Sequence, residues 1–223
     1  MPVKVGLQYI EIWKDSMENA VRKYEEEPIV TDQIVFYGPS YFTRWSTKYG
    51  MTPLREVLVG ESGAPCCVNR GFGSSCAEHQ LYYYSRMVRP LRPRVLVYSS
   101  YANGSSFGYT PEESWELAQR VIAYAMTDFP ELRVYLCGTT PAREENEAAL
   151  LRTAKYDAMQ KEFAESHENC FFLDLRASEA LCRKDIFIAD GVHYNQEGYQ
   201  LFADFFREAL KDELAQYCPP YII

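Results

Sequence analysis

Short apolar runs alternate with long amphipathic stretches along most of the chain, and this alternation constrains the fold more than any other feature of the sequence. The apolar runs lie at 34–37, 66–68, 94–98, 133–137 and 170–175. Helical spacing of apolar residues is present at 9–26, from about 40, and at 77–88, 112–127, 144–166 and 196–214. Continuous apolar runs are typical of strands that are buried on both faces. The alternation therefore predicts an α/β fold with a parallel sheet covered by helices on both faces.

Length and composition limit the domain organisation and the partners. The 223 residues suffice for one well-buried core, and no repeat, low-complexity segment or linker divides them. We therefore expect a single domain over residues 1–223. A net charge of −8 without a basic stripe argues against a nucleic-acid partner or an anionic membrane surface. No stretch approaches the apolar length of a membrane span.

The cysteines and the first residues bear on the cellular compartment. The chain has seven cysteines, an odd number, and no Cys-x-x-Cys pair. Buried, reduced thiols are favoured over a disulfide framework or a metal site. The N-terminal residues lack the apolar core of a signal peptide. We therefore expect a cytoplasmic protein without a metal or cofactor, although a signal removed before residue 1 would leave no trace.

Chemically active side chains follow the predicted strands. In a parallel sheet, functional residues gather in the loops beyond the C-terminal ends of the strands. Ser40, the glycine-bearing loop 69–75 and Asn103 all fall on that edge of the sheet. Asp190 and His193 lie between the last strand and the last helix. The topology therefore predicts that these residues lie close together.

These residue types suit acyl transfer, which needs a nucleophile, a base, a group that orients the base, and donors for the oxyanion. The Asp190-x-x-His193 spacing lets a carboxylate orient an imidazole, which can take the proton of Ser40. Ser40 would begin a helix, whose dipole favours developing negative charge. The oxyanion donors would be the Ser40 N–H, an N–H within residues 71–75, and the Asn103 side-chain amide.

Each of these residues also has a purely structural interpretation. A serine after a strand is often a helix N-cap, and Asn103-Gly104 is a favoured turn pair. Asp190-Gly191 is likewise a common turn. Gly71 and Gly73 would then supply positive φ angles in their loop.

Four blocks, taken in order, resemble the SGNH (GDSL-like) hydrolases. The first runs from Ile34 to Ser40 with Trp45 after it, and the second is Asn69-Arg70-Gly71-Phe72-Gly73-Ser74-Ser75. The third runs from Pro93 to Asn103, and the last is Asp190-Gly191-Val192-His193-Tyr194-Asn195. The resemblance implies a flavodoxin-like three-layer α/β/α fold and metal-free hydrolysis of an ester through an acyl-enzyme. It assigns catalysis to Ser40, His193 and Asp190.

The chain departs from the family pattern at three places. Pro39 replaces the usual acidic residue before the nucleophile. In the second block, the oxyanion-binding glycine aligns with Ser74, with Gly73 as the alternative, so the resemblance gives an oxyanion hole of Ser40, Ser74 and Asn103. The third block usually reads glycine-x-asparagine-aspartate, and here it is Tyr101-Ala102-Asn103-Gly104. The flanking residues that usually position the asparagine are therefore different.

The function predicted from these blocks is a serine esterase that acts on a small acyl ester, with an O-acetylated carbohydrate as one candidate substrate. Two alternatives use the same pocket: a ligand-binding relative without activity, and an acyltransferase to an alcohol other than water. The remaining histidines, His79 and His167, lie in charged helical surroundings and are expected at the surface. Arg70 has two interpretations, contact with a polar substrate and an ion pair that braces its loop, and the ion pair is favoured. The sequence identifies neither the substrate nor the oligomeric state, and a homo-oligomer is one of the alternatives.

Overall fold

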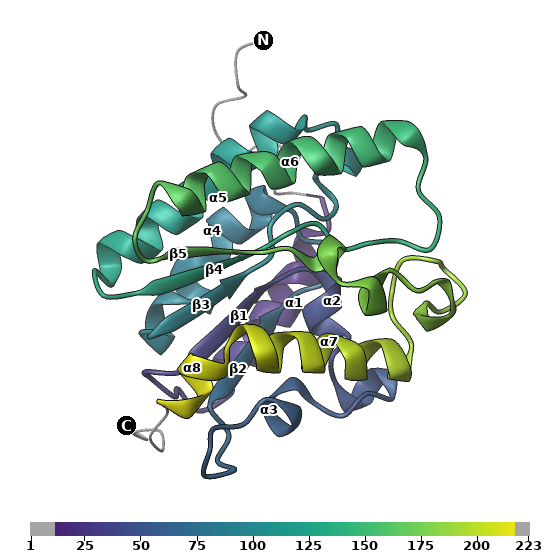
Figure 1. Ribbon diagram of the computed structural model, residues 1–223. Coiled ribbons are helices and arrows are strands. Elements are labelled where there is room, and N and C mark those ends of the chain that lie inside the picture. Colours follow the sequence, from purple (N-terminus) through teal and green to yellow (C-terminus); the bar gives the residue numbers. More distant parts are fainter. Residues whose placement is uncertain (1–11, 217–223) are drawn as a thin grey trace.

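The centre of the molecule is a sheet of five parallel strands. A computed structural model describes residues 12–216 (Figure 1). The sheet order is β2-β1-β3-β4-β5, and every neighbouring pair is parallel. This is the order of the flavodoxin-like doubly wound folds. The strands are β1 (Ile34–Gly38), β2 (Cys67–Gly71), β3 (Val95–Tyr98), β4 (Arg133–Cys137) and β5 (Cys170–Leu173).

Successive strand residues point to opposite faces of the sheet, and both faces are buried. In β1, Val35 and Tyr37 join one hydrophobic core, whereas Ile34 and Phe36 join the other. All four side chains have no exposed surface. A sheet that is apolar on both faces must be covered on both, which explains why the strand runs lack polar alternation.

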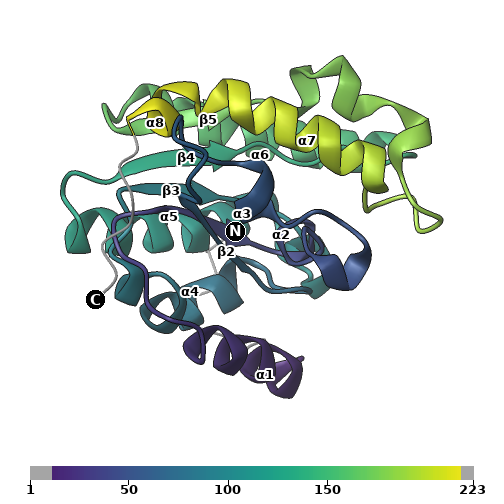
Figure 2. The ribbon, with the colours of Figure 1, turned by 90° about the horizontal axis from the view of Figure 1, so that it is seen from below.

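Helices form the two outer layers (Figures 1 and 2). One core is shared with α1, α4, α5 and α6, and the other with α2, α3, α7 and α8. Figure 2 shows α1 beside α4 at the β2 end of the sheet, and α7 and α8 across β4 and β5. The helices are α1 (Lys14–Glu25), α2 (Ser40–Thr43), α3 (Leu54–Val57), α4 (Ala77–Met87), α5 (Pro111–Asp128), α6 (Glu147–Glu165), α7 (Gln196–Ala209) and α8 (Lys211–Ala215).

Short 3-10 turns occupy several connections between these elements. They are η1 (Thr47–Tyr49), η2 (Arg89–Leu91), η3 (Gly104–Phe107), η4 (Leu175–Ala177), η5 (Glu179–Cys182) and η6 (Lys184–Ile186). Three of them, η4 to η6, fill the connection between β5 and α7 that carries Asp190 and His193 further on. No helix within residues 12–216 has the length and apolarity that crossing a membrane requires.

The three-layer α/β/α fold predicted from the sequence is confirmed, with four differences in detail. Asn69, Arg70 and Gly71 belong to β2 and not to the loop after it. The helix expected to begin at Ser40 is a single turn of four residues. The last helix breaks at Leu210, where α7 ends and α8 starts. The first helix begins at Lys14, and positions 9–11 lie outside the described residues.

The described cysteines are free thiols. Cys66, Cys67, Cys76, Cys137 and Cys170 are buried, and Cys182 is exposed. The sulfurs of the vicinal pair Cys66 and Cys67 lie 4.0 Å apart, beyond the length of an S–S bond. The expectation of buried, reduced thiols is confirmed for these five cysteines, whereas the Cys182 thiol is free but exposed.

Candidate active site

Ser40 is the first residue of α2, directly after β1. The strand end beneath it is tightly packed, because a Cβ on Gly38 would lie 2.9 Å from the Ser99 Cβ and 3.0 Å from the Phe42 ring. Only glycine therefore lets β1 end against β3 at this point. The Ser40 carbonyl accepts from the Arg44 N–H at 2.8 Å and closes the helical turn. The Ser40 hydroxyl is left half-buried at the edge of the sheet.

A chain of hydrogen bonds joins Ser40 to residues more than 150 positions away. The Ser40 Oγ lies 2.8 Å from His193 Nε2. On the other side of the ring, His193 Nδ1 lies 2.7 Å from Asp190 Oδ2. Because an ionised carboxylate only accepts, Nδ1 carries the proton and donates it to Asp190. Nε2 is then the acceptor for the Ser40 hydroxyl, which is the tautomer that a general base needs.

The Asp190 carboxylate also accepts hydrogen bonds from the backbone of its own loop. Its Oδ1 accepts from the backbone N–H groups of Val192 and His193, both at 2.9 Å. Burial acts to raise the pKa of Asp190, but hydrogen bonds from the His193 ring and from these two N–H groups outweigh it. The pKa falls from 3.8 to about 2. Asp190 is therefore ionised near neutral pH and accepts the proton of His193 Nδ1.

The loop that carries Asp190 and His193 is held by a guanidinium that the sequence did not single out. Arg143, in the β4–α6 connection, donates from Nη2 to the carbonyls of Ile188 at 3.0 Å and Ala189 at 2.9 Å. Its backbone N–H donates to the Gly191 carbonyl at 2.8 Å. The one sequence feature that points to Arg143 is its place after β4, at the C-terminal ends of the strands. Its acceptors are backbone carbonyls, which no sequence motif marks.

Tyr41 supports the same loop from the side of the nucleophile. Its hydroxyl donates to the Val192 carbonyl at 2.6 Å, and its ring centroid lies 5.6 Å from that of His193. The Tyr41 carbonyl in turn accepts from the Tyr199 hydroxyl at 2.7 Å. Helix α7, the loop before it and α2 are therefore bonded together around one buried tyrosine. No sequence motif marks Tyr41, although it follows Ser40 directly.

Two of the predicted oxyanion donors lie on loops with left-handed backbone. Ser74 has a φ of 63° and Asn103 a φ of 67°. The Asn103 Nδ2 donates to the Ser75 carbonyl at 2.9 Å, which ties the β3 loop to the β2 loop. An amide nitrogen has two N–H donors, so a second one remains for another acceptor. This bond between the two loops holds the Asn103 side chain in place.

The glycines of the second block have a different role from the one their sequence suggests. Gly71 and Gly73 do not have positive φ angles; Ser74 does. The structural alternative for these two glycines is therefore wrong. A Cβ on Gly71 would lie 2.4 Å from the backbone nitrogen of Thr43, so this glycine lets β2 pack against α2. Asn69 strengthens this contact by donating to the Phe42 carbonyl at 2.7 Å.

A buried amide lies beneath the oxyanion loops. Gln80 in α4 has no exposed surface, and its Nε2 donates to the Ser99 carbonyl at 3.1 Å and to the Ser75 Oγ at 3.4 Å. The backbone carbonyl of Gln80 accepts from the Tyr37 hydroxyl at 2.6 Å. The loops after β2 and β3 therefore share one anchor in the core.

The predicted surroundings are wrong for His79 and confirmed for His167 and Arg70. His79 is not a surface residue: it is fully buried, with Nδ1 3.2 Å from the Cys76 Sγ. His167 is exposed and stacks on Phe163 with ring centroids 3.9 Å apart. Arg70 forms the expected ion pair, with Glu27 at 2.7 Å. Within residues 12–216, no group of three or more His, Cys, Asp or Glu side chains is arranged to hold a metal ion.

No protein-family model and no curated protein matches this chain. Solved structures do. A GDSL-like lipase from Bacteroides thetaiotaomicron has a TM-score of 0.68 at 15% identity, over 88% of this chain and 98% of its own. An acetylxylan esterase from Geobacillus stearothermophilus has a TM-score of 0.64 at 16% identity, over 86% and 100%. A carbohydrate esterase family 3 protein from Talaromyces cellulolyticus has a TM-score of 0.63 at 13% identity, over 82% and 98%.

At these identities the likeness concerns the fold, on which many different sites can be built. The strand order, the two helical layers and the position of Ser40 after β1 are all features of one architecture. The chain has the three-layer α/β/α fold of the SGNH (GDSL-like) hydrolases.

Proposed function

We propose that the protein is a serine esterase that hydrolyses a small acyl ester, with Ser40 as nucleophile, His193 as general base and Asp190 as the group that orients it. The observation that carries the proposal is the continuous hydrogen-bond chain from the Ser40 Oγ through His193 to Asp190. A nucleophile, a base within hydrogen-bond reach and a carboxylate on the far ring nitrogen are the arrangement that activates a serine.

In the first half-reaction, the Ser40 Oγ attacks the acyl carbon and its proton passes to His193 Nε2. Negative charge develops on the carbonyl oxygen. This oxygen accepts hydrogen bonds from the N–H groups of Ser40 and Ser74 and from the second Nδ2–H of Asn103. Collapse of the intermediate breaks the bond to the alcohol, which leaves with the proton held on Nε2. The acyl group stays on Ser40.

In the second half-reaction, water attacks the acyl-enzyme while His193 Nε2 takes its proton. Collapse of this second intermediate breaks the bond between the acyl carbon and the Ser40 Oγ, which takes the proton back from Nε2 as the carboxylic acid is released. The His193 side chain is 15% exposed and that of Asp190 38% exposed, so solvent reaches this site.

Structural neighbours favour a carbohydrate as the alcohol part of the ester. An acetylxylan esterase and a carbohydrate esterase family 3 protein share the fold. We therefore propose an O-acetylated carbohydrate as the substrate class. In this substrate the acyl group is small, and the larger alcohol part needs room outside the immediate surroundings of Ser40.

The proposal is tested by the turnover of 4-nitrophenyl acetate. Ser40→Ala is expected to lower kcat by about 10⁴-fold or more, because removal of a triad nucleophile leaves only the contribution of binding and the oxyanion donors. Ser166→Ala is the matched control, since Ser166 is exposed at the end of α6 and bonds only within its own helix end and to His167. Wild-type turnover in Ser40→Ala would exclude Ser40 as the nucleophile.

A further inference from the structure

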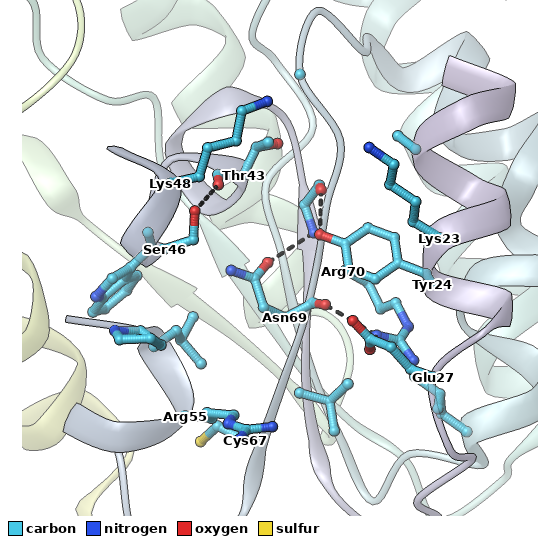
Figure 3. A pocket seen from close by; sticks show the side chains of 18 of the residues that line it. Lys23, Tyr24, Glu27, Thr43, Ser46, Lys48, Arg55, Cys67, Asn69 and Arg70 are labelled. Carbon is cyan, nitrogen blue, oxygen red and sulfur yellow. Dashed lines mark hydrogen bonds and ion pairs between the residues drawn. The ribbon is translucent and has the colours of Figure 1, made fainter. Parts of the chain in front are cut away.

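A large groove runs along the outer edge of β2 (Figure 3). Its volume is about 970 Å³. Helix α1 forms one wall, and the segment from α2 through η1 to α3 forms the other. Because β2 is the last strand on this side of the sheet, its edge forms the floor. Pockets of this size accommodate ligands much larger than an acetyl group.

One end of this groove reaches the proposed oxyanion site. Thr43, Gly73 and Ser74 contribute to its lining. Thr43 belongs to the same helical turn as Ser40, and Ser74 is a proposed oxyanion donor. Ser40 and His193 are not part of the lining, so the groove adjoins the reacting atoms rather than enclosing them. It is therefore placed to hold a part of the substrate that extends away from the ester bond.

The groove is cationic although the chain as a whole is acidic, with a net charge of −8. Lys23, Lys48, Arg55 and Arg70 line it, and the single carboxylate is that of Glu27. Glu27 is paired with Arg70 at 2.7 Å. Among the described residues, the other three cations have no acidic partner. Figure 3 shows Lys23 and Lys48 extending from opposite walls at one end of the groove, and Arg55 near Cys67 at the other.

Helix α1 separates its charges between two faces. Glu18 and Glu25 both bind Arg86 of α4, at 2.8 Å and 2.7 Å, on the side that packs against the molecule. Lys23 lies on the face that lines the groove. Lysines often protect an exposed strand edge from pairing with another chain. In this molecule, however, Lys23 and Lys48 lie on the flanking walls and not on β2, so protection of the edge does not account for them.

Aromatic rings accompany the cations on both walls. Tyr24 and Tyr49 are half-buried and line the groove from opposite sides. The Tyr24 hydroxyl donates to the Gly71 carbonyl at 2.7 Å, which fixes the position of its ring. Cations already lie over both rings: the Arg70 guanidinium is 4.7 Å from the Tyr24 centroid, and Lys48 Nζ is 5.4 Å from the Tyr49 centroid. The rings therefore position cations along the groove, and lysine and arginine bind carboxylates. A long groove with cations on both walls suits an extended chain of sugars that carries carboxylate groups.

We infer that this groove binds the alcohol part of the ester, and that this part is an acidic oligosaccharide whose carboxylates contact Lys23, Lys48 and Arg55. The inference rests on the proposed esterase function, because it assigns the acyl group to Ser40 and the rest of the substrate to the groove. The groove runs from the Ser74 loop toward α3, so the sugars nearest the acyl group meet Lys48 and Lys23, and those further away meet Arg55.

Binding to the Ser40→Ala protein tests the inference without depending on turnover. The titrants are an oligogalacturonate, which carries a carboxylate on each sugar, a neutral xylo-oligosaccharide of the same length, and inorganic phosphate. Isothermal titration calorimetry at low salt is expected to give a Kd about 10-fold or more lower for the acidic chain than for the neutral one. The difference should shrink as salt screens the exposed charges.

Charge removal locates the binding site. In the Ser40→Ala background, Lys23→Met with Lys48→Met is expected to weaken binding of the acidic chain by about 10-fold and binding of the neutral chain much less. Lys161→Met is the matched control, because Lys161 is exposed on α6 and lies outside the groove. Circular dichroism checks that each variant is folded.

Equal affinity for the acidic and neutral chains, or an unchanged affinity in the double variant, would overturn the inference. Saturable binding of phosphate without binding of the oligogalacturonate would also overturn it, since the groove would then recognise a compact anion and no sugar. These results are distinct from a failure of the esterase proposal, which appears as an absence of 4-nitrophenyl acetate turnover in the wild-type protein. If that turnover is absent while the acidic chain binds, the groove remains a carbohydrate site, but its ligand is not the substrate of an esterase.

Discussion

The hydroxyl of Tyr41 donates a 2.6 Å hydrogen bond to the carbonyl of Val192. Tyr41 follows the proposed nucleophile and Val192 precedes the proposed base, so this bond fixes the two halves of the site relative to each other. The residues are 151 positions apart, and the bond is part-buried. A shift of either loop would lengthen the 2.8 Å contact between Ser40 and His193.

Tyr41→Phe removes this bond while it keeps the ring that packs on His193. We expect kcat for 4-nitrophenyl acetate to fall by about 10-fold with a smaller change in KM, because one hydrogen bond of about 1 kcal/mol is lost and the base loop is less well positioned. Tyr124→Phe is the control, since Tyr124 is exposed on α5. An unchanged kcat in Tyr41→Phe would show that the loop holds its position without this bond.

Asp190→Asn should keep the geometry but lower kcat by about 10⁴-fold, because an amide favours the wrong tautomer of the His193 ring. The same residue makes a pH-dependent contribution to stability. Its pKa is lowered from 3.8 to about 2 in the folded state. The carboxylate therefore stabilises the fold above pH 3.8, and this contribution is lost as the pH falls toward 2.

Urea denaturation of the wild type and Asp190→Asn at about pH 5 and about pH 3 measures this contribution. The difference between their free energies of unfolding is expected to be smaller at the lower pH. A difference that grows on acidification would contradict the direction of the pKa shift.

Asn103→Ala removes a proposed oxyanion donor together with the 2.9 Å bond to the Ser75 carbonyl. Loss of an oxyanion donor typically lowers kcat by about 10²–10³-fold. The turnover of 4-nitrophenyl acetate and the melting temperature, measured together, separate the two roles. If Asn103 acts mainly as a donor, kcat falls while the protein keeps its melting temperature to within a few degrees. A variant that melts much earlier and has an unchanged kcat would assign Asn103 a structural role only.

Ser74→Gly tests whether the second-block donor is the backbone N–H. Ser74 has a φ of 63°, a conformation that costs a non-glycine residue about 1 kcal/mol. Glycine relieves this cost but has more conformational entropy to lose on folding, so we expect a stability between unchanged and about 1 kcal/mol higher. The N–H remains, and kcat should stay within about 3-fold of the wild type. A loss of 100-fold would implicate the Ser74 hydroxyl instead.

Much of this architecture could be predicted from the sequence because each buried strand is an apolar run. Strand β2 was the exception in part: Asn69, Arg70 and Gly71 have the composition of a loop but continue the strand. At the edge of the sheet these polar residues find partners outside it, such as Phe42 for Asn69 and Glu27 for Arg70. A polar edge strand cannot be distinguished from a loop by composition alone.

The candidate site was predictable where a side chain contacts a side chain. Ser40, His193 and Asp190 were assigned from their motifs, and the structure brings them within hydrogen-bond distance. Arg143 and Tyr41 were missed because they bond to backbone carbonyls of a distant loop, and a carbonyl carries no sequence signature. The prediction that His79 lies at the surface was wrong because its polar neighbours Glu78 and Gln80 are typical of an exposed helix face. All three side chains are buried.

Reaction with a fluorophosphonate ester tests the central claim most directly, because the reagent phosphonylates only a serine that a neighbouring base activates. Intact-protein and peptide mass spectrometry are expected to find one adduct per chain, located on Ser40, and no adduct in Ser40→Ala or, over the same time, in His193→Ala. An adduct on another serine, or none on Ser40 in the folded wild-type protein, would contradict the assignment of Ser40 as an activated nucleophile.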